Sequence, residues 1–249
     1  MKKILLAGES WETFSIHIKG FDTFFTSKYE EGAKWLIEAL EDAGYEVDFI
    51  PNQHAASKFP TEMEEISQYD TVILSDIGSN TLLLHPDTFE KSIPTPNRLK
   101  LIREYVKEGG SFLMVGGYMS FQGIDAKSKY KDSPIEEILP VVMMATDDRV
   151  EVPEGMYPEA VKKHIVLDGI EEKWPMLLGY NKFAADENGE VLVEYNGDPM
   201  VVVGEYGNGR TAAFASDCAP HWGSPEFVKW ENYGKFWAQL IGWLRKDIK

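Results

Sequence analysis

The sequence predicts an α/β fold with a mostly parallel sheet and helices on both of its faces. Four apolar runs, at residues 3–8, 45–51, 70–78 and 111–117, are separated by segments with helical periodicity. Most of these runs are continuously apolar, which is typical of parallel strands that are buried on both sides. After about residue 141, short β-rich runs follow one another with Asn-Gly and Gly-Asn-Gly turns between them, which predict antiparallel hairpins.

The first half of the chain alternates strand and helix. The strand at residues 3–8 leads into a polar loop at residues 9–11 and then into an unusually long connection, which could form a lid or a dimer contact. That connection contains His17, Lys19 and Asp22. A helix is expected from about residue 27 to residue 43, with Gly44 as its stop.

Two more helices are expected. Thr95-Pro96 has the form of an N-cap and first helical position, and predicts a helix that runs to about Glu108. The last helix should begin after Ser224-Pro225 and carry one apolar face, which helical spacing assigns to core packing. That face comprises Phe227, Trp230, Tyr233, Trp237, Leu240, Ile241 and Leu244.

The short strands of residues 175–217 are expected to extend the same sheet. They are Leu-Leu-Gly-Tyr-Asn-Lys-Phe-Ala-Ala from residue 177, then residues 190–195, 200–206 and 210–217. Because no Pro- or Ser-rich linker divides the halves, we expect one domain over residues 1–249, with an antiparallel elaboration at about 141–217.

Composition argues against binding to nucleic acid or insertion into a membrane. The 41 acidic and 25 basic residues give a net charge of -16, which disfavours contact with a phosphate backbone. No segment reaches the ~18 apolar residues that span a bilayer, and the apolar start is too short for a signal peptide. The lone Cys218 excludes an intramolecular disulfide. We expect a cytoplasmic protein that could form a homo-oligomer.

Polar residues follow several of the predicted strands. Residues 9–11, 76–78 and 116–118 each lie at the carboxyl end of a predicted strand of the parallel part, and residues 217–222 lie at the end of the last strand. Because reactive groups in such sheets gather at the carboxyl ends of the strands, these segments should approach one another.

The segments GESW, IKGFDTF, SDIGSN, VGGYMSF and YGNGRTAAFASDCAPHWG together resemble the putative glutamine amidotransferase-like family, a branch of the class I glutamine amidotransferase-like superfamily. The resemblance covers nearly the whole chain, and the late segment is its most specific part. It implies a flavodoxin-like three-layer sandwich with added antiparallel strands in the C-terminal half.

In active members of the superfamily, the strand that corresponds to residues 111–117 ends in a turn of the form G-x-C-x-G, and the cysteine of this turn attacks the substrate amide. Here the resemblance places Tyr118 at the nucleophile position and Ser120 at the second glycine. His221 corresponds to the late histidine, but the acid expected two residues later is Gly223. Two of the three triad members are therefore changed, which predicts the loss of glutaminase activity.

The chemistry of the phenol strengthens this prediction. A free cysteine has a pKa of about 8.5 and a tyrosine a pKa of about 10, so far less of the tyrosine is ionised at neutral pH. A fully anionic Tyr118 would need a shift of about three pKa units, or ~4 kcal/mol of differential stabilisation. We therefore expect its hydroxyl to act as a hydrogen-bond donor.

Four residues are the candidates for catalytic groups: Tyr118, His221, Asp217 and Glu9. Seven more are expected to contact a ligand, namely Ser10, Trp11, Asp76, Gly78, Gly116, Gly117 and Trp222. Asp76 and Gly78 could supply backbone N–H donors to an oxyanion, or only close a turn. Cys218 is expected to be buried and inert.

No cofactor and no metal are predicted, although Glu9, Asp76, Asp217 and His221 together leave a metal site open as an alternative. The expected ligand is a small polar metabolite. Two other functions remain open: a divergent hydrolase that uses Tyr118, His221 and Asp217, and a non-catalytic module for ligand binding or assembly.

Overall fold

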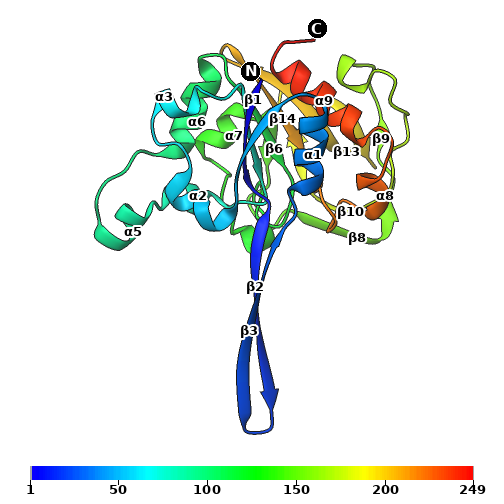
Figure 1. Ribbon diagram of the computed structural model, residues 1–249. Helices are drawn as coiled ribbons and strands as arrows, with labels where there is room; N and C mark the ends of the chain where they lie inside the picture. Colours follow the sequence, from blue (N-terminus) through cyan, green and yellow to red (C-terminus); the bar gives the residue numbers. More distant parts are fainter. Residues whose placement is uncertain (1, 249) are drawn as a thin grey trace.

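The computed structural model describes residues 2–248 as an α/β sandwich from which one long hairpin projects (Figure 1). Within these residues, eight strands form the central sheet. Their order is β4 (Glu46–Ile50), β1 (Lys3–Gly8), β5 (Thr71–Ser75), β6 (Ser111–Val115), β14 (Gly209–Phe214), β13 (Asp198–Tyr206), β12 (Glu190–Tyr195) and β9 (Glu159–Ala160).

The first five strands of this order are parallel, and the remaining pairings are antiparallel. The chain enters at β1, passes outward to β4 and returns across β1 to β5, which is the strand order of flavodoxin-like folds. The predicted mixed fold is therefore confirmed. Buried side chains of β1, β5, β6 and β14 form the centre of the core.

Helices cover the sheet on both faces (Figure 1). Those between β1 and β14 are α1 (Lys34–Asp42), α2 (Asn52–Lys58), α3 (Met63–Ile66), α4 (Ser79–Leu83), α5 (Pro86–Lys91), α6 (Arg98–Lys107) and α7 (Pro134–Ile138). The chain ends with α8 (Pro225–Val228) and α9 (Tyr233–Leu244), and α9 packs beside α1. Two short 3₁₀ helices occupy Ile124–Ala126 and Ile165–Leu167.

The long connection after β1 is a two-stranded ribbon. Strands β2 (Ser10–Lys19) and β3 (Asp22–Glu31) pair antiparallel along their whole length and extend away from the sandwich (Figure 1). The prediction of a helix from about residue 27 was therefore wrong at its start. Cross-strand pairing takes residues 27–31 into β3, and the helix α1 begins only at Lys34.

Two other helix boundaries differ from the prediction. Asn97 caps α6, and its side-chain oxygen accepts hydrogen bonds from the amides of Leu99 and Lys100. Ser224 caps α8 as expected, but the predicted single C-terminal helix is divided between Val228 and Tyr233.

The late strands divide between the main sheet and two small ones. Strands β12, β13 and β14 extend the main sheet through antiparallel hairpins, as predicted. The run from residue 177 was expected to be one strand of that sheet, and this was wrong. It forms β10 (Leu177–Asn181), which pairs with β8 (Arg149–Met156), and β11 (Phe183–Ala185), which pairs with β7 (Val141–Met143).

No helix in the described part of the chain is long and apolar enough to cross a bilayer.

Candidate functional site

The site lies where the strand order reverses, between β1 and β5. Glu9 follows β1 directly and Asp76 follows β5, so both acids emerge at the carboxyl edge of the sheet. Both residues have a φ of 45°, in the left-handed region. A side chain in that region costs of order 1–3 kcal/mol, and such strain is concentrated at functional positions. The position at a topological switch point is also where ligands bind in open α/β sheets.

Three carboxyl groups gather at this edge: those of Glu9 and Asp217, which are buried, and that of Asp76, which is half-buried. Asp217 comes from the loop after β14. Burial raises the pKa of all three groups. The negative charges of Asp217 and Asp76 raise the pKa of Glu9 further. The cluster is therefore an acidic site that holds protons more tightly than free carboxyl groups do.

Neutral donors satisfy parts of this cluster. The Ser75 hydroxyl donates to Oε2 of Glu9 at 2.5 Å. The Met119 amide donates to Oδ1 of Asp76 at 2.6 Å, and the Ala219 amide donates to Oδ1 of Asp217 at 2.9 Å. These hydrogen bonds lower the pKa values of the three carboxyl groups, but burial outweighs them, so the pKa values stay raised.

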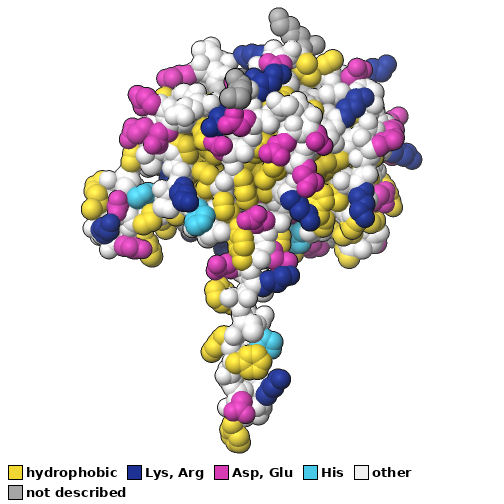
Figure 2. Space-filling view, viewed as in Figure 1, with side chains coloured by type: hydrophobic (Ala, Val, Ile, Leu, Met, Phe, Trp, Pro, Cys, Tyr) yellow, Lys and Arg dark blue, Asp and Glu magenta, His cyan; other side chains and the backbone are white. Residues whose placement is uncertain are grey.

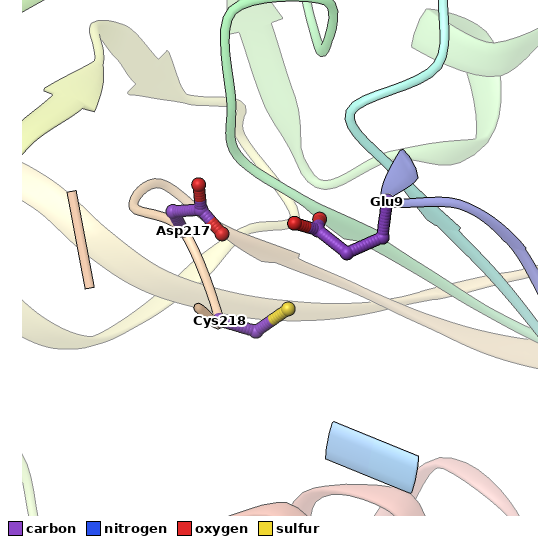
Figure 3. Close-up of side chains that lie close together, drawn as sticks. All are labelled: Glu9, Asp217 and Cys218. Carbon is purple, nitrogen blue, oxygen red and sulfur yellow. The ribbon is translucent and has the colours of Figure 1, made fainter. Parts of the chain in front are cut away.

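Glu9, Asp217 and Cys218 point toward one another in Figure 3. Their ligand atoms all lie within 4.8 Å of one another, so they are the residues that could hold a metal ion. Burial raises the pKa of the Cys218 thiol well above its ordinary value, as it does for both carboxyl groups. A metal would have to displace protons from this set, which makes its binding dependent on pH.

His221 connects the buried acids to the surface. Its Nδ1 lies 3.5 Å from Oδ2 of Asp217, while its side chain is 42% exposed. Tyr118 meets the imidazole edge to face, with the ring centroids 4.4 Å apart, and the Trp222 ring stacks at 5.6 Å from the imidazole. The predicted residues Tyr118, His221, Asp217 and Glu9 are thus brought together in one continuous row.

The Tyr118 hydroxyl is held by a carboxylate. It donates to Oε1 of Glu151 at 2.9 Å, and the indole of Trp222 donates to the other carboxylate oxygen at 3.0 Å. The Arg149 guanidinium lies 4.8 Å from the centre of the Tyr118 ring. Burial, followed by the hydrogen bond to Glu151, raises the pKa of Tyr118. The phenol is therefore suited to donate a hydrogen bond and poorly suited to attack as an anion.

Buried polar side chains hold the turn after β6 in place. The Gly117 amide donates to Oδ1 of Asn181 at 2.9 Å, and the Asn181 amide group donates to Asp148 at 2.9 Å. Gly117 has a φ of 154°, and a Cβ there would press against the Asp76 carboxylate. Glycine at this position lets the turn approach the acid closely.

The other predicted ligand contacts have structural partners. Ser10 is buried and accepts a hydrogen bond from the Asn52 amide at 2.7 Å, while Trp11 is 37% exposed at the base of the ribbon. The Asp76 amide donates to Oγ of Ser120 at 3.0 Å, so it is already paired. Gly78 is the N-cap residue of α4.

Gly116 lies against the end of β14, where its amide donates to the Phe214 carbonyl oxygen at 2.8 Å.

Sequence reasoning missed the residues that orient this site. Ser75 and Asn181 lie within predicted strands, and the hydropathy pattern of those strands does not distinguish these two residues from core positions. Glu151 lies on β8, which the sequence did not predict, and only the charged run at residues 147–151 marks the segment. A separate cavity of about 760 Å³ is lined by residues of the loop 160–172 and includes none of the predicted site residues.

A family model described as "Putative glutamine amidotransferase" matches residues 3–246. The chain belongs to this family. The family that the sequence resemblance implied is therefore confirmed. A search of curated proteins found no match.

Two solved structures from Salmonella typhimurium resemble this family member over almost their entire length. Cytoplasmic Protein STM3548 is 46% identical, with a TM-score of 0.94, and the alignment covers 97% of this chain and 98% of that one. Cytoplasmic Protein STM1381, from strain LT2, is 48% identical, with a TM-score of 0.94 and coverage of 97% and 99%.

A putative ThuA-like protein from Parabacteroides merdae shares only the fold. It is 14% identical, with a TM-score of 0.57, and the alignment covers 99% of this chain and 90% of that one.

Proposed function

We propose that this family member binds a small polar metabolite at the carboxyl ends of β1, β5, β6 and β14, and that it does not hydrolyse glutamine. The observation that carries the proposal is the cluster of two buried carboxyl groups, Glu9 and Asp217, and the half-buried Asp76 at the topological switch point. Burying acids destabilises a fold, and two of these acids also occupy strained backbone positions, so we expect the cluster to serve a function.

The chemistry of the cluster defines the kind of ligand. Carboxyl groups with raised pKa values can accept hydrogen bonds from an amine or a hydroxyl group, and they attract a positive charge. A ligand with an ammonium group would stabilise the carboxylate forms and lower the three pKa values. Its binding would then release protons, whereas a neutral polyol would bind with little proton release.

The absence of glutamine hydrolysis follows from the nucleophile. Tyr118 takes the place of the cysteine, and its raised pKa leaves the phenol protonated at neutral pH. The thiol of Cys218 is buried with a raised pKa, and its Sγ lies 3.8 Å from the Ser75 hydroxyl. Neither group is therefore ionised readily to the anion, phenolate or thiolate, that would attack the amide carbonyl.

A second candidate function is a hydrolase in which Tyr118, His221 and Asp217 act as a proton-transfer chain. The observation that favours it is the contact between the Tyr118 and His221 rings, together with the 3.5 Å approach of His221 to Asp217. In this function His221 would take a proton from water, and Tyr118 would donate one to a leaving group. Its signature would be a rate that depends on pH and falls at least about 100-fold in His221→Ala.

The binding proposal is tested by thermal unfolding with a panel of amino acids, amines, polyols and sugars. We expect at least one class to raise the unfolding temperature of the native chain, and the effect to disappear in Glu9→Gln and Asp217→Asn. Lys58→Gln, on the surface at the end of α2, is the control and should retain the effect. Stabilisation that is equal in all four proteins would place binding elsewhere and contradict the proposal.

The site of action is proposed to be the cytoplasm. Both of the similar Salmonella proteins are named as cytoplasmic proteins, which supports the expectation drawn from the sequence.

A further inference from the structure

The ribbon of β2 and β3, which we call the arm, has one apolar face and one polar face. In the register of the two strands, Ile16 lies opposite Phe25, and the next pair along is His17 opposite Phe24. Because side chains alternate between the faces of a ribbon, these two pairs point in opposite directions. The face of Ile16 also carries Phe14, Ile18, Phe25 and Tyr29, which we call the apolar face of the arm.

The apolar face is open to solvent. Phe14, Ile16, Ile18 and Phe25 are between 63 and 73% exposed, and Tyr29 is 40% exposed. Figure 2 shows hydrophobic side chains along the projecting hairpin, below the body of the molecule. An isolated two-stranded hairpin is at best marginally stable in water, so an arm of this length requires a surface that covers one of its faces.

We propose that the apolar face of the arm packs against the same face of a second copy of this chain, and that the arms form a two-fold symmetric dimer. Under two-fold symmetry the same patch is used on both subunits, and an apolar face is complementary to itself. The proposal is independent of the ligand proposed above, since it concerns the arm and not the carboxyl cluster.

The exposed area is sufficient for a stable dimer. With roughly 200 Å² for each large side chain, the apolar face offers on the order of 600 Å² per arm. Two arms would bury on the order of 1,200 Å² from these side chains alone, which reaches the range of specific interfaces. Phe21 at the tip of the arm is fully exposed and would add to this area.

Charge favours a protein partner over a lipid surface. Residues 10–31 contain four acidic and two basic side chains, and the whole chain carries a net charge of -16. Anionic membranes attract clusters of Lys and Arg, which this arm does not have. Its acidic and basic residues lie mainly on the polar face or near the base, so they do not oppose contact between two apolar faces.

The test is light scattering after size exclusion, over a series of protein concentrations, with three variants. Ile16→Thr/Phe25→Thr alters the apolar face, while His17→Thr/Phe24→Thr alters the neighbouring pair on the polar face. A third variant replaces residues 12–29 by Asn-Gly, which closes a short hairpin and removes the arm. Circular dichroism and urea unfolding show whether each variant retains its fold.

We expect the native chain and the polar-face variant to be dimers. The apolar-face variant should dissociate with a Kd raised at least about 100-fold, and the armless variant should be a folded monomer. A native chain that is monomeric at every concentration would overturn the proposal. Binding of such a monomer to phosphatidylcholine vesicles would indicate a lipid surface as the partner and would overturn it too. Equal dimerisation of the apolar-face and polar-face variants, or a dimer without the arm, would overturn it as well.

Discussion

Replacing Glu9 by Gln should stabilise the protein at neutral and alkaline pH but not in acid. The Glu9 side chain is buried, and burial together with the charges of Asp217 and Asp76 raises its pKa well above the ordinary value. Gln has nearly the same shape, and its side-chain oxygen can still accept the hydrogen bond from the Ser75 hydroxyl. The substitution therefore removes the ionisable group with little change in packing.

The sign follows from the direction of the shift. Because the folded state holds this proton more tightly than the unfolded state, the contribution of Glu9 to stability is most favourable below its unfolded pKa of about 4.3. This contribution falls as the pH rises toward the folded pKa, by about 1.4 kcal/mol for each unit between the two values. Gln does not titrate, so Glu9→Gln should gain at least ~1.4 kcal/mol relative to the native chain between pH 4 and pH 8.

Urea unfolding followed by tryptophan fluorescence, from pH 4 to pH 8, measures this difference. Glu38→Gln is the control, because Glu38 lies exposed on α1 and its replacement should change stability little. A difference between Glu9→Gln and the native chain that does not depend on pH would refute the reasoning. It would mean that Glu9 is already charged in the folded protein at no cost.

Three further predictions concern the framework of the site. Gly8→Ala should destabilise the protein by about 3 kcal/mol or more in urea unfolding, because φ is 109° and a Cβ would overlap the Ser75 carbonyl oxygen. Gly44→Ala, at a φ of 84° but in open space, should cost only ~1 kcal/mol, and equal losses would contradict the steric argument. Arg98→Met should cost about 2–4 kcal/mol in the same assay, because the buried guanidinium donates to carbonyl groups at the ends of α2 and α4. Cys218 should react with a thiol reagent in urea but hardly at all in the native protein, and rapid native labelling would refute its burial.

The parallel core was predictable from the sequence because most of its strands are continuously apolar, and β1, β5 and β6 are each followed by glycine or a polar residue. The ribbon was not predictable in the same way. Residues 22–31 contain apolar and aromatic residues that fit a helix or a strand over a short window, and only pairing with residues 10–19 decides between them. The helix α1 was therefore started too early.

The candidate site was predictable to the extent that its residues follow strands. Glu9, Asp76, Tyr118 and Asp217 each follow a strand of the parallel sheet, so the topology brings them to one edge. Glu151 was not predictable, since it reaches Tyr118 and Trp222 from β8, and β8 pairs with a strand outside the main sheet. Such long-range contacts leave no periodic signal along the chain.

The proposal that this protein does not hydrolyse glutamine is tested most directly by ammonia release from glutamine, with the native chain, Tyr118→Phe, His221→Ala and Cys218→Ala. We expect release by all four proteins to equal that of buffer alone. Turnover by the native chain that survives in Cys218→Ala but disappears in Tyr118→Phe and His221→Ala would contradict this expectation. It would mean that Tyr118 acts as the nucleophile although its pKa is raised.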